Sequence, residues 1–181
     1  MIFQIDEQTA KQKARNVRML LLDVDGVLTD GKLYVGSSGE VLKVFNSLDG
    51  HGIKMLKRTG IEVGIISGRD SPALSWRAAE LGIQLLYKGR EDKLAVLEEI
   101  TSNGTCSNDQ IAYAGDDLPD LAVMTRVGLA ISVPNGHQEA RQRADLLTET
   151  VGGNGAVREI CDFLLQAQGN YQQSIEQAVD S

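Results

Sequence analysis

The sequence predicts an α/β protein with a doubly wound, mostly parallel sheet. Short apolar runs alternate with amphipathic helical stretches along most of the chain, and this alternation is typical of strands joined by crossover helices. A single early β-hairpin interrupts the alternation. A chain of 181 residues is long enough for one domain with a sizeable core. We expect a domain over residues 17–169, an N-terminal arm over residues 1–16 and a polar tail over residues 170–181.

The first third of the chain contains the leading strand, the hairpin and a helix. Residues 1–15 are polar and fit a short helix or arm. The apolar run at residues 17–22 suits a strand that is buried on both faces of a parallel sheet. "GSSGE" separates the apolar segments 32–35 and 41–45, which predicts a hairpin. Residues 51–59 have the apolar spacing of a helix and end at a glycine.

The rest of the chain alternates between strands and helices. Ser71 and Pro72 are typical of the N-cap and first position of a helix. The patterns predict strands at residues 62–67, 84–87, 110–115, 128–132 and 145–148, and helices at 71–81, 92–100, 118–124, 136–144 and 156–168. The last of these helices is amphipathic, and the polar residues after it are expected to be irregular. No segment is long enough for a separate cap domain.

The composition argues against several classes of protein. Hydrophobic residues make up 42% and charged residues 24% of the chain, as in ordinary soluble proteins. The net charge of −7 argues against a general binder of nucleic acid or anionic membranes. The chain has no apolar run of membrane-spanning length, no signal-peptide core at the N-terminus, and no zinc spacing around Cys106 and Cys161. We therefore expect a cytoplasmic protein with two reduced thiols.

Polar residues of complementary kinds follow four of the expected strands. In an open parallel sheet, ligands bind beyond the carboxyl ends of the strands. Asp23 and Asp25 follow the first strand, "SGRD" the second and "GDDLPD" the fourth, while Lys93 comes soon after the third. Four such strand ends are hard to explain as ordinary surface loops. The sequence therefore predicts a site that contains acids, a hydroxyl group and a cation.

This set of side chains predicts phosphate chemistry assisted by a divalent cation. The carboxylates of Asp23 and Asp116 come from different strands and can share a hard cation, for which we expect Mg²⁺. Mg²⁺ usually binds one or two carboxylates together with phosphate oxygens, so a phosphate is the natural ligand. Ser67 and the backbone around Gly68 can hold phosphate oxygens, and Lys93 can neutralise them.

The two acids after the first strand fit the two roles needed for phosphate hydrolysis. An aspartate that faces a phosphate can act as a nucleophile and form an aspartyl-phosphate. A second carboxyl group can protonate the leaving oxygen and later activate water. We assign the first role to Asp23 and the second to Asp25, and Gly26 lets the backbone turn tightly beside the ligand.

These pieces resemble the motifs of the haloacid dehalogenase superfamily of phosphohydrolases. "DVDGVLTD", "ISGR", the lysine of "REDK" and "GDDLPD" have the order and spacing of the four superfamily motifs. A narrower resemblance, over residues 17–169, is to the 3-deoxy-D-manno-octulosonate 8-phosphate phosphatases, through "DVDGVLTDG", "NSLDGHGIKML" and "GGNGAVREICD". It implies hydrolysis of a small phosphorylated sugar acid of lipopolysaccharide synthesis. It also implies a homotetramer in which a neighbouring subunit helps to close the active site.

The resemblance implies the same catalytic pair and a metal site. Asp23 would be the nucleophile and Asp25 the general acid and base. Mg²⁺ would be held by the carboxylates of Asp23 and Asp116 and by the backbone carbonyl of Asp25.

The resemblance also implies roles for residues around this centre. Ser67 and Lys93 would bind the phosphoryl group, and Arg69 would meet the substrate or its phosphate. Asp117 and Asp120 would fix the loop behind these ligands. Two basic residues of a nearby loop match nothing and have no assigned role: Lys88 and Arg90.

The hairpin predicts self-association of the chain. Its apolar residues do not alternate cleanly with polar ones, so both faces are expected to be apolar: Leu33, Val35, Val41, Val44 and Phe45. An isolated hairpin is marginal in water, so we expect copies of it to pack together in an oligomer. Trp76 is assigned to core or interface packing. The "GGNG" segment or the polar tail is a candidate to reach a neighbour's active site.

Three other functions fit parts of the pattern. A 9-phosphate phosphatase for a nonulosonate would use the same residues, because these act on the phosphate rather than on the sugar. A phospho-accepting signalling module of the receiver type also gathers acids, a hydroxyl group and a lysine, but its acid pair and its acceptor aspartate lie on different strands. An inactive scaffold would keep clustered carboxylates that destabilise the fold without any use.

Overall fold

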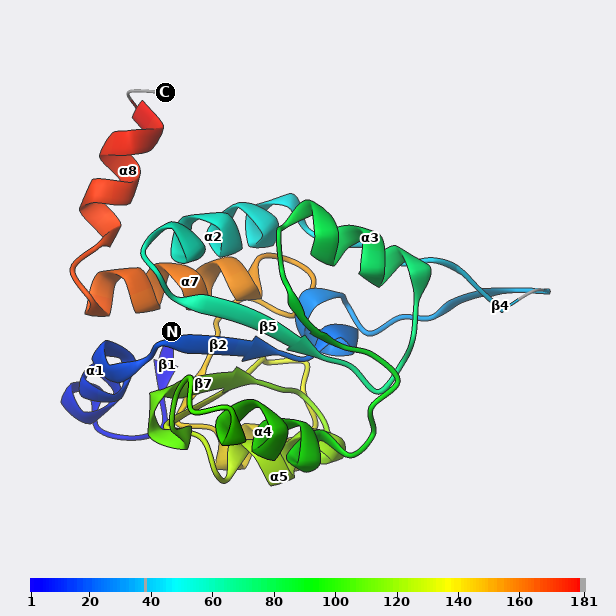
Figure 1. The fold of residues 1–181 in the computed structure, drawn as a ribbon, viewed down its shortest axis with the longest axis horizontal. Helices are drawn as coiled ribbons and strands as arrows, with labels where there is room; N and C mark the ends of the chain where they lie inside the picture. Colours follow the sequence, from blue (N-terminus) through cyan, green and yellow to red (C-terminus); the bar gives the residue numbers. More distant parts are fainter. Residues whose placement is uncertain (38, 180–181) are drawn as a thin grey trace.

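A seven-stranded sheet lies between two layers of helices (Figure 1). The computed structural model describes residues 1–37 and 39–179, so residue 38 in the expected hairpin turn and residues 180–181 of the expected tail lie outside it. The strands are β1 (Ile2–Phe3), β2 (Met19–Leu22), β3 (Tyr34–Gly36), β4 (Gly39–Leu42), β5 (Glu62–Ile66), β6 (Leu85–Tyr87), β7 (Ile111–Ala114), β8 (Leu129–Ser132) and β9 (Leu146–Leu147). The α-helices are α1 (Glu7–Asn16), α2 (Ser47–Arg58), α3 (Pro72–Glu80), α4 (Lys93–Ser102), α5 (Leu121–Met124), α6 (Gln138–Arg143), α7 (Ala156–Ala167) and α8 (Tyr171–Val179).

The sheet reverses its winding between β2 and β7. Its strand order is β1-β9-β8-β7-β2-β5-β6, and the pairs are parallel except for β1 with β9. The chain winds outward from β2 through β5 to β6 and then starts again on the other side of β2 with β7. Leu22, the last residue of β2, pairs with Ile65 on one side and with Ala114 on the other. A crevice that can hold a ligand is expected at such a reversal, beyond the carboxyl ends of the strands.

Helices bury both faces of the sheet. Helices α1, α2, α3 and α7 pack on one face, and α4, α5 and α6 pack on the other. Every residue of β2, β7 and β8 is therefore buried, which explains why these strands are apolar runs without alternation. The expected doubly wound fold is confirmed. None of the helices in the described residues is long and apolar enough to cross a bilayer.

Both ends of the chain contribute regular structure. β1 adds an antiparallel edge strand beside β9, and its two residues are too few to show a period in the sequence. The helix expected near the N-terminus is α1, which buries Ala10 and Ala14. The expectation of an irregular tail is wrong for residues 171–179, which form α8. Tyr171 and Ile175, one helical turn apart, pack against the core, and this tertiary contact outweighs the polar composition.

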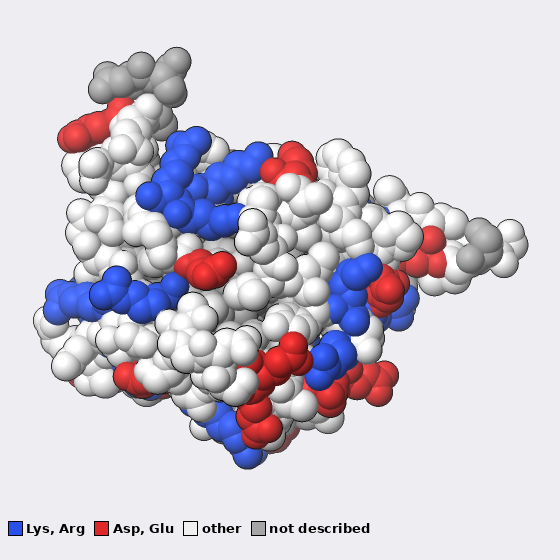
Figure 2. All heavy atoms as spheres, in the orientation of Figure 1, with Lys and Arg blue, Asp and Glu red and all other residues white. Residues whose placement is uncertain are grey.

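The hairpin β3–β4 projects from the body of the molecule (Figure 1). Figure 2 shows it mostly in white, because few charged side chains lie on it. Its exposed apolar side chains are Leu33, Tyr34, Val35, Val41, Leu42 and Val44. Trp76 on α3 is 69% exposed, so it does not belong to the core, and interface packing remains a prediction. Apart from residue 38, the chain between β2 and α2 forms only a turn, this hairpin and short connections, as expected for a protein without a separate cap domain.

The glycine turn before α7 packs directly against the loop that follows β2. A Cβ atom on Gly152 would lie 1.7 Å from the carbonyl oxygen of Gly26. Asn135 joins the same two residues, because its Nδ2 donates to the Gly26 carbonyl oxygen at 3.0 Å and its Oδ1 accepts from the Gly152 N–H at 2.7 Å. Close contact within the chain therefore requires a glycine at residue 152.

We expect Gly152→Ala to lower the free energy of unfolding by about 3 kcal/mol, because the added methyl group must displace backbone atoms. Urea unfolding measures this change. Gly104→Ala is the matched control, since Gly104 has φ of +72° but nothing lies within 4 Å of an added Cβ. The control should lose only about 1 kcal/mol through backbone strain. Equal losses in the two variants would contradict the close contact.

Candidate active site

An open cleft of about 640 Å³ lies at the carboxyl ends of the strands. It is lined by Asp23, Asp25, Ser67, Gly68, Arg69, Glu91, Lys93, Asp116, Asp117 and Pro119. The structure thus brings every predicted site residue to one cleft except Asp120, which lies buried directly behind it. Segments far apart in the sequence meet here because parallel strands end at the same edge of the sheet.

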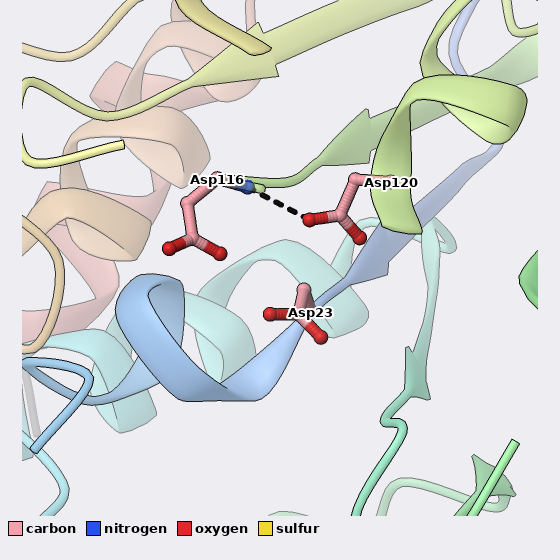
Figure 3. A group of neighbouring side chains, drawn as sticks. All are labelled: Asp23, Asp116 and Asp120. Atoms are coloured by element: carbon pink, nitrogen blue, oxygen red, sulfur yellow. Dashed lines mark hydrogen bonds between the residues drawn. The ribbon is translucent and has the colours of Figure 1, made fainter. Parts of the chain in front are cut away.

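Asp23 lies at the centre of the site. Its backbone N–H donates to the carbonyl oxygen of Ala114 at 2.9 Å, which continues the pairing of β2 with β7 by one residue. Its side chain accepts a hydrogen bond from Lys93 Nζ at 2.6 Å. Figure 3 shows the carboxylates of Asp23, Asp116 and Asp120 turned toward one another, and one oxygen from each lies within 4.8 Å of the others.

A tight turn after Asp23 makes room for Asp116. The turn spans Val24–Leu28, and Gly26 within it has φ of +108°, a conformation that favours glycine. A Cβ atom on Gly26 would lie only 2.0 Å from Asp116 Oδ2. The buried hydroxyl of Thr29 closes the turn, because it donates to the carbonyl oxygen of Val24 at 3.3 Å and accepts from the Gly26 N–H at 3.4 Å. The glycine after the acid pair is therefore needed for both the turn and the position of the second acid cluster.

Asp120 stabilises the site and has no free oxygen for a ligand. Its Oδ1 accepts from Lys93 Nζ at 2.6 Å and from the Tyr113 hydroxyl at 2.5 Å. Its Oδ2 accepts from the backbone N–H groups of Asp116 at 2.9 Å, drawn dashed in Figure 3, and of Asp117 at 3.0 Å. Of the three facing acids, only Asp23 and Asp116 therefore have oxygens available to a cation.

Crowding and burial raise the proton affinity of these two acids. Burial raises the pKa of Asp116 to about 8, and the negative charges of Asp23 and Asp120 add to the shift. Burial also raises the pKa of Asp23 to about 6, although the positive charge of Lys93 opposes this. Asp116 Oδ1 is buried and has no hydrogen-bond partner among the described residues. Such an oxygen beside a second carboxylate is the arrangement that a bound cation would compensate.

The donors present fit Mg²⁺. This ion prefers oxygen ligands and usually takes one or two carboxylates while it keeps several waters. Asp23 and Asp116 offer two carboxylates from neighbouring strand ends, and the cleft leaves the other side open for waters and ligand oxygens. The buried, unpartnered oxygen of Asp116 supports the same conclusion.

Lys93 and Ser67 bring a cation and a hydroxyl group to the same cleft. Burial alone would lower the pKa of Lys93, but the charges of Asp23 and Asp120 outweigh it and raise this pKa above its usual value. Lys93 therefore stays charged and can attract an anion. Ser67 follows β5 and is buried, and its Oγ accepts from the backbone N–H of Arg69 at 3.2 Å.

The two basic residues without an assigned role are not among those that line the cleft. Lys88 Nζ lies 2.6 Å from Asp70 Oδ1 and donates to Ser75 Oγ at 2.7 Å. Arg90 forms a two-pronged ion pair with Asp92, at 2.7 and 2.9 Å. Both side chains therefore stabilise loops beside the cleft.

Sequence reasoning missed two charged residues that the hairpin brings to the site. Lys43, just past β4, forms an ion pair with Asp25, and its side chain is only 4% exposed. Glu40 accepts from Ser71 Oγ at 2.6 Å and lies 3.6 Å from Arg69 Nη2. In the sequence, Glu40 and Lys43 stand out only as two charged residues, three positions apart, in an otherwise apolar segment. Neither of them belongs to a recognised motif.

Comparison with known proteins identifies relatives of this chain. Residues 83–160 match the family model of haloacid dehalogenase-like hydrolases. The 3-deoxy-D-manno-octulosonate 8-phosphate phosphatase KdsC of Escherichia coli strain K12 is 46% identical over 167 residues, which cover 92% of this chain and 89% of that protein.

Solved structures share the fold over nearly the whole chain. The 3-deoxy-D-manno-octulosonate 8-phosphate phosphatase of Moraxella catarrhalis, crystallised with a magnesium ion, a phosphate ion and a KDO molecule, has a TM-score of 0.92 at 41% identity and covers 95% of this chain and 99% of its own. The cobalt-bound deoxy-D-mannose-octulosonate 8-phosphate phosphatase of Haemophilus influenzae has a TM-score of 0.87 at 39% identity, with 91% and 99% covered.

We expect the free energy of unfolding of the metal-free protein to fall as the pH rises from about 4 to about 8. The raised pKa values of Asp23, about 6, and Asp116, about 8, mean that the folded chain holds protons that the unfolded chain has released. This stabilisation is complete below the unfolded pKa of about 4 and is lost as the pH passes the folded values. Mg²⁺ should reduce the loss, because the cation takes the place of the protons.

Urea unfolding at a series of pH values with EDTA measures this dependence. Asp116→Asn is the control, because its amide cannot titrate, so the part of the loss that extends to about pH 8 should disappear. An unchanged pH dependence in Asp116→Asn would contradict the assignment of that loss to Asp116.

Proposed function

Because the chain belongs to the 3-deoxy-D-manno-octulosonate 8-phosphate phosphatase family of haloacid dehalogenase-like hydrolases, we propose that it removes the phosphate of 3-deoxy-D-manno-octulosonate 8-phosphate in the synthesis of lipopolysaccharide precursors. The protein is a sugar-phosphate phosphatase, and its cofactor is Mg²⁺. The observation that carries the proposal is the pair of facing carboxylates, in which Asp23 accepts a hydrogen bond from the charged Lys93 and Asp116 has a buried unpartnered oxygen.

The substrate proposal is supported by the relatives. The enzyme of Moraxella catarrhalis was crystallised with a magnesium ion, a phosphate ion and a KDO molecule. Hydrolysis of 3-deoxy-D-manno-octulosonate 8-phosphate yields 3-deoxy-D-manno-octulosonate, abbreviated KDO, and inorganic phosphate. That enzyme and this chain are 41% identical, and the match covers 95% of this chain, so the same substrate is the simplest expectation here.

The proposed reaction has two steps, both carried out by the acids after β2. The carboxylate of Asp23 attacks the phosphorus atom, the bond to the sugar oxygen breaks, and Asp25 donates a proton to that leaving oxygen. Asp25 then takes a proton from a water molecule, whose oxygen attacks the phosphoryl group on Asp23. Inorganic phosphate leaves, and both carboxyl groups return to their starting states.

The remaining cleft residues are proposed to hold the phosphate and the cation. Mg²⁺ would be held by the carboxylates of Asp23 and Asp116 and the backbone carbonyl of Asp25, and when bound it supplies positive charge against the phosphate oxygens. Ser67, the backbone at Gly68 and the charged Lys93 would bind phosphate oxygens.

Arg69 and the second acid cluster complete the proposed set of roles. Arg69 would contact the substrate at the mouth of the cleft, where its side chain is 46% exposed. Asp120 would fix Lys93 and the backbone at residues 116–117 through its four hydrogen bonds. Asp117 would hold the following turn, since its Oδ1 accepts from the Leu118 N–H at 2.8 Å.

A nonulosonate 9-phosphate is the second candidate substrate. The residues that would bind phosphate do not distinguish between the two sugars, so this alternative stays open. Membership in a family of hydrolases does not support the signalling-module and inactive-scaffold alternatives.

We further propose that the chain works as a cytoplasmic homotetramer with residues 17–169 as its phosphatase domain. The support for association is the long row of exposed apolar side chains on the hairpin, together with the exposed Trp76 on α3. Monomeric proteins rarely leave such patches open to water.

We expect rapid phosphate release from 3-deoxy-D-manno-octulosonate 8-phosphate with Mg²⁺, none with EDTA, and a loss of at least about 10³-fold in Asp23→Asn, because the amide is a poor nucleophile. A colorimetric phosphate assay measures this. A panel with a nonulosonate 9-phosphate and hexose phosphates tests the substrate. Faster release from the nine-carbon substrate would discard the proposed sugar and keep the mechanism, while undiminished release by Asp23→Asn would overturn the mechanism.

We expect a mass well above that of the monomer by light scattering at micromolar concentration. The double variant Val35→Lys, Val41→Lys should reduce the mass, because it places charges on an apolar contact surface. Val179→Lys is the control, since Val179 is 78% exposed but lies on α8, away from the hairpin. A monomeric parent protein would refute the proposed association.

A further inference from the structure

The carboxylate of Asp25 is held from behind by the hairpin. Asp25 lines the cleft, and Lys43, which does not, forms an ion pair with Asp25 Oδ1. The Lys43 side chain is 4% exposed and that of Asp25 is 20% exposed. Among the described residues, Lys43 makes the only hydrogen bond to the Asp25 carboxylate, and Arg69 Nε lies farther away, 3.7 Å from Asp25 Oδ2. The direction of this carboxyl group in the cleft therefore depends on a residue of the hairpin.

A second contact anchors Lys43 in place. Glu40, three residues earlier, lies with its Oε2 3.5 Å from Lys43 Nζ. Its Oε1 accepts from Ser71 Oγ at 2.6 Å, and its Oε2 lies 3.6 Å from Arg69 Nη2. Because Ser71 caps α3, these contacts join the hairpin to the loop between β5 and α3. Lys43 is thus fixed against the body of the molecule, although the rest of the hairpin projects from it.

The residues that follow the hairpin are also fixed to the body of the molecule. Arg77 on α3 donates from Nη2 to the carbonyl oxygen of Asn46 at 3.1 Å. Its guanidinium carbon lies 6.0 Å from the centre of the Phe45 ring, within the range of a cation–π contact. The chain on either side of Val44 is therefore tied down, at Lys43 by ion pairs and at residues 45–46 by Arg77.

We propose that Lys43 is a positioning residue of the reaction, which holds the Asp25 carboxyl group in the direction needed to transfer protons. This inference rests on the proposed function, because it assigns to Asp25 the role of general acid and base. A general acid must lie within hydrogen-bond distance of the atom that it protonates. Small errors of position remove much of its contribution. Lys43 itself is not among the residues that line the cleft, so it would act on the reaction through Asp25.

The proposal predicts that the effect of Lys43 depends on the leaving group. In the first step the P–O bond to the leaving group breaks, and a sugar alkoxide needs the proton from Asp25 to leave as a neutral hydroxyl. The p-nitrophenolate ion is a weak base and leaves without a proton. The ratio kcat/KM reports only the steps up to release of the leaving group, so it isolates this proton transfer from the later hydrolysis of the aspartyl-phosphate.

We expect Lys43→Met to lower kcat/KM for 3-deoxy-D-manno-octulosonate 8-phosphate about 10- to 100-fold, since loss of the whole acid–base group removes roughly 10²- to 10⁴-fold. For p-nitrophenyl phosphate, kcat/KM should stay within about threefold of the parent value, because that leaving group needs no proton. Methionine keeps the unbranched apolar stem, and Lys43→Arg should restore part of the activity toward the sugar phosphate. Lys32→Met is the matched control, because Lys32 pairs with Asp30 and its side chain is 73% exposed. Lys32→Met should leave kcat/KM unchanged for both substrates.

Several outcomes would overturn the positioning role. An equal fall for both substrates would show a general structural or phosphate-binding effect of Lys43, and no fall for either would show that Asp25 does not need it. Lys43→Gln provides a second variant if Lys43→Met fails to fold by thermal unfolding. If the parent protein prefers another sugar phosphate, the same comparison is made with that substrate, so a wrong sugar would fail separately from the role of Lys43. A parent protein that hydrolyses no alkyl phosphate would overturn both proposals.

Discussion

The rest of this structure depends on one electrostatic constraint. Two carboxylates lie close together, partly buried, where the winding of the sheet reverses. Asp23 and Asp116 follow neighbouring strands, so the fold brings them together whether or not their charges repel. The chain compensates part of this charge with Lys93 and orders the backbone with Asp120, both of which are buried. The oxygen of Asp116 that remains without a partner is left for a cation. The crowding that destabilises the metal-free site is the same feature that a bound Mg²⁺ would compensate.

Close backbone contact keeps this centre rigid. Gly26 passes beneath the Asp116 carboxylate, and Gly152 presses against Gly26 from the other side. Asn135 links the two glycines with a pair of hydrogen bonds. Residues separated by more than a hundred positions thus support the active site, although none of them is among the residues that line the cleft. A catalytic constellation needs such support, because its geometry must hold within a fraction of an ångström.

The hairpin has an apolar outer part and a charged base. Its outer surface exposes a row of apolar side chains, while Glu40 and Lys43 at its base reach the residues of the cleft. The ammonium group of Lys43 is buried, and the hydrogen bond to Asp25 and the charge of Glu40 compensate it, since an unpaired buried charge is costly. Order in the hairpin and the direction of the Asp25 carboxyl group are therefore linked by the same side chain.

The sequence by itself determined the sheet, the strand ends and the four groups of site residues. Continuous apolar runs such as residues 19–22 mark strands that are buried on both faces, and the residues after parallel strands must share one edge. The resemblance to known phosphatases assigns Asp116 to the metal and Asp120 to the loop, but only the tertiary structure shows the reason. The oxygens of Asp120 are occupied by Lys93, Tyr113 and backbone N–H groups. The tertiary structure also decided that Lys43 faces Asp25 and that residues 171–179 form a helix. These features depend on contacts between distant segments, and such contacts leave no period or spacing in the sequence.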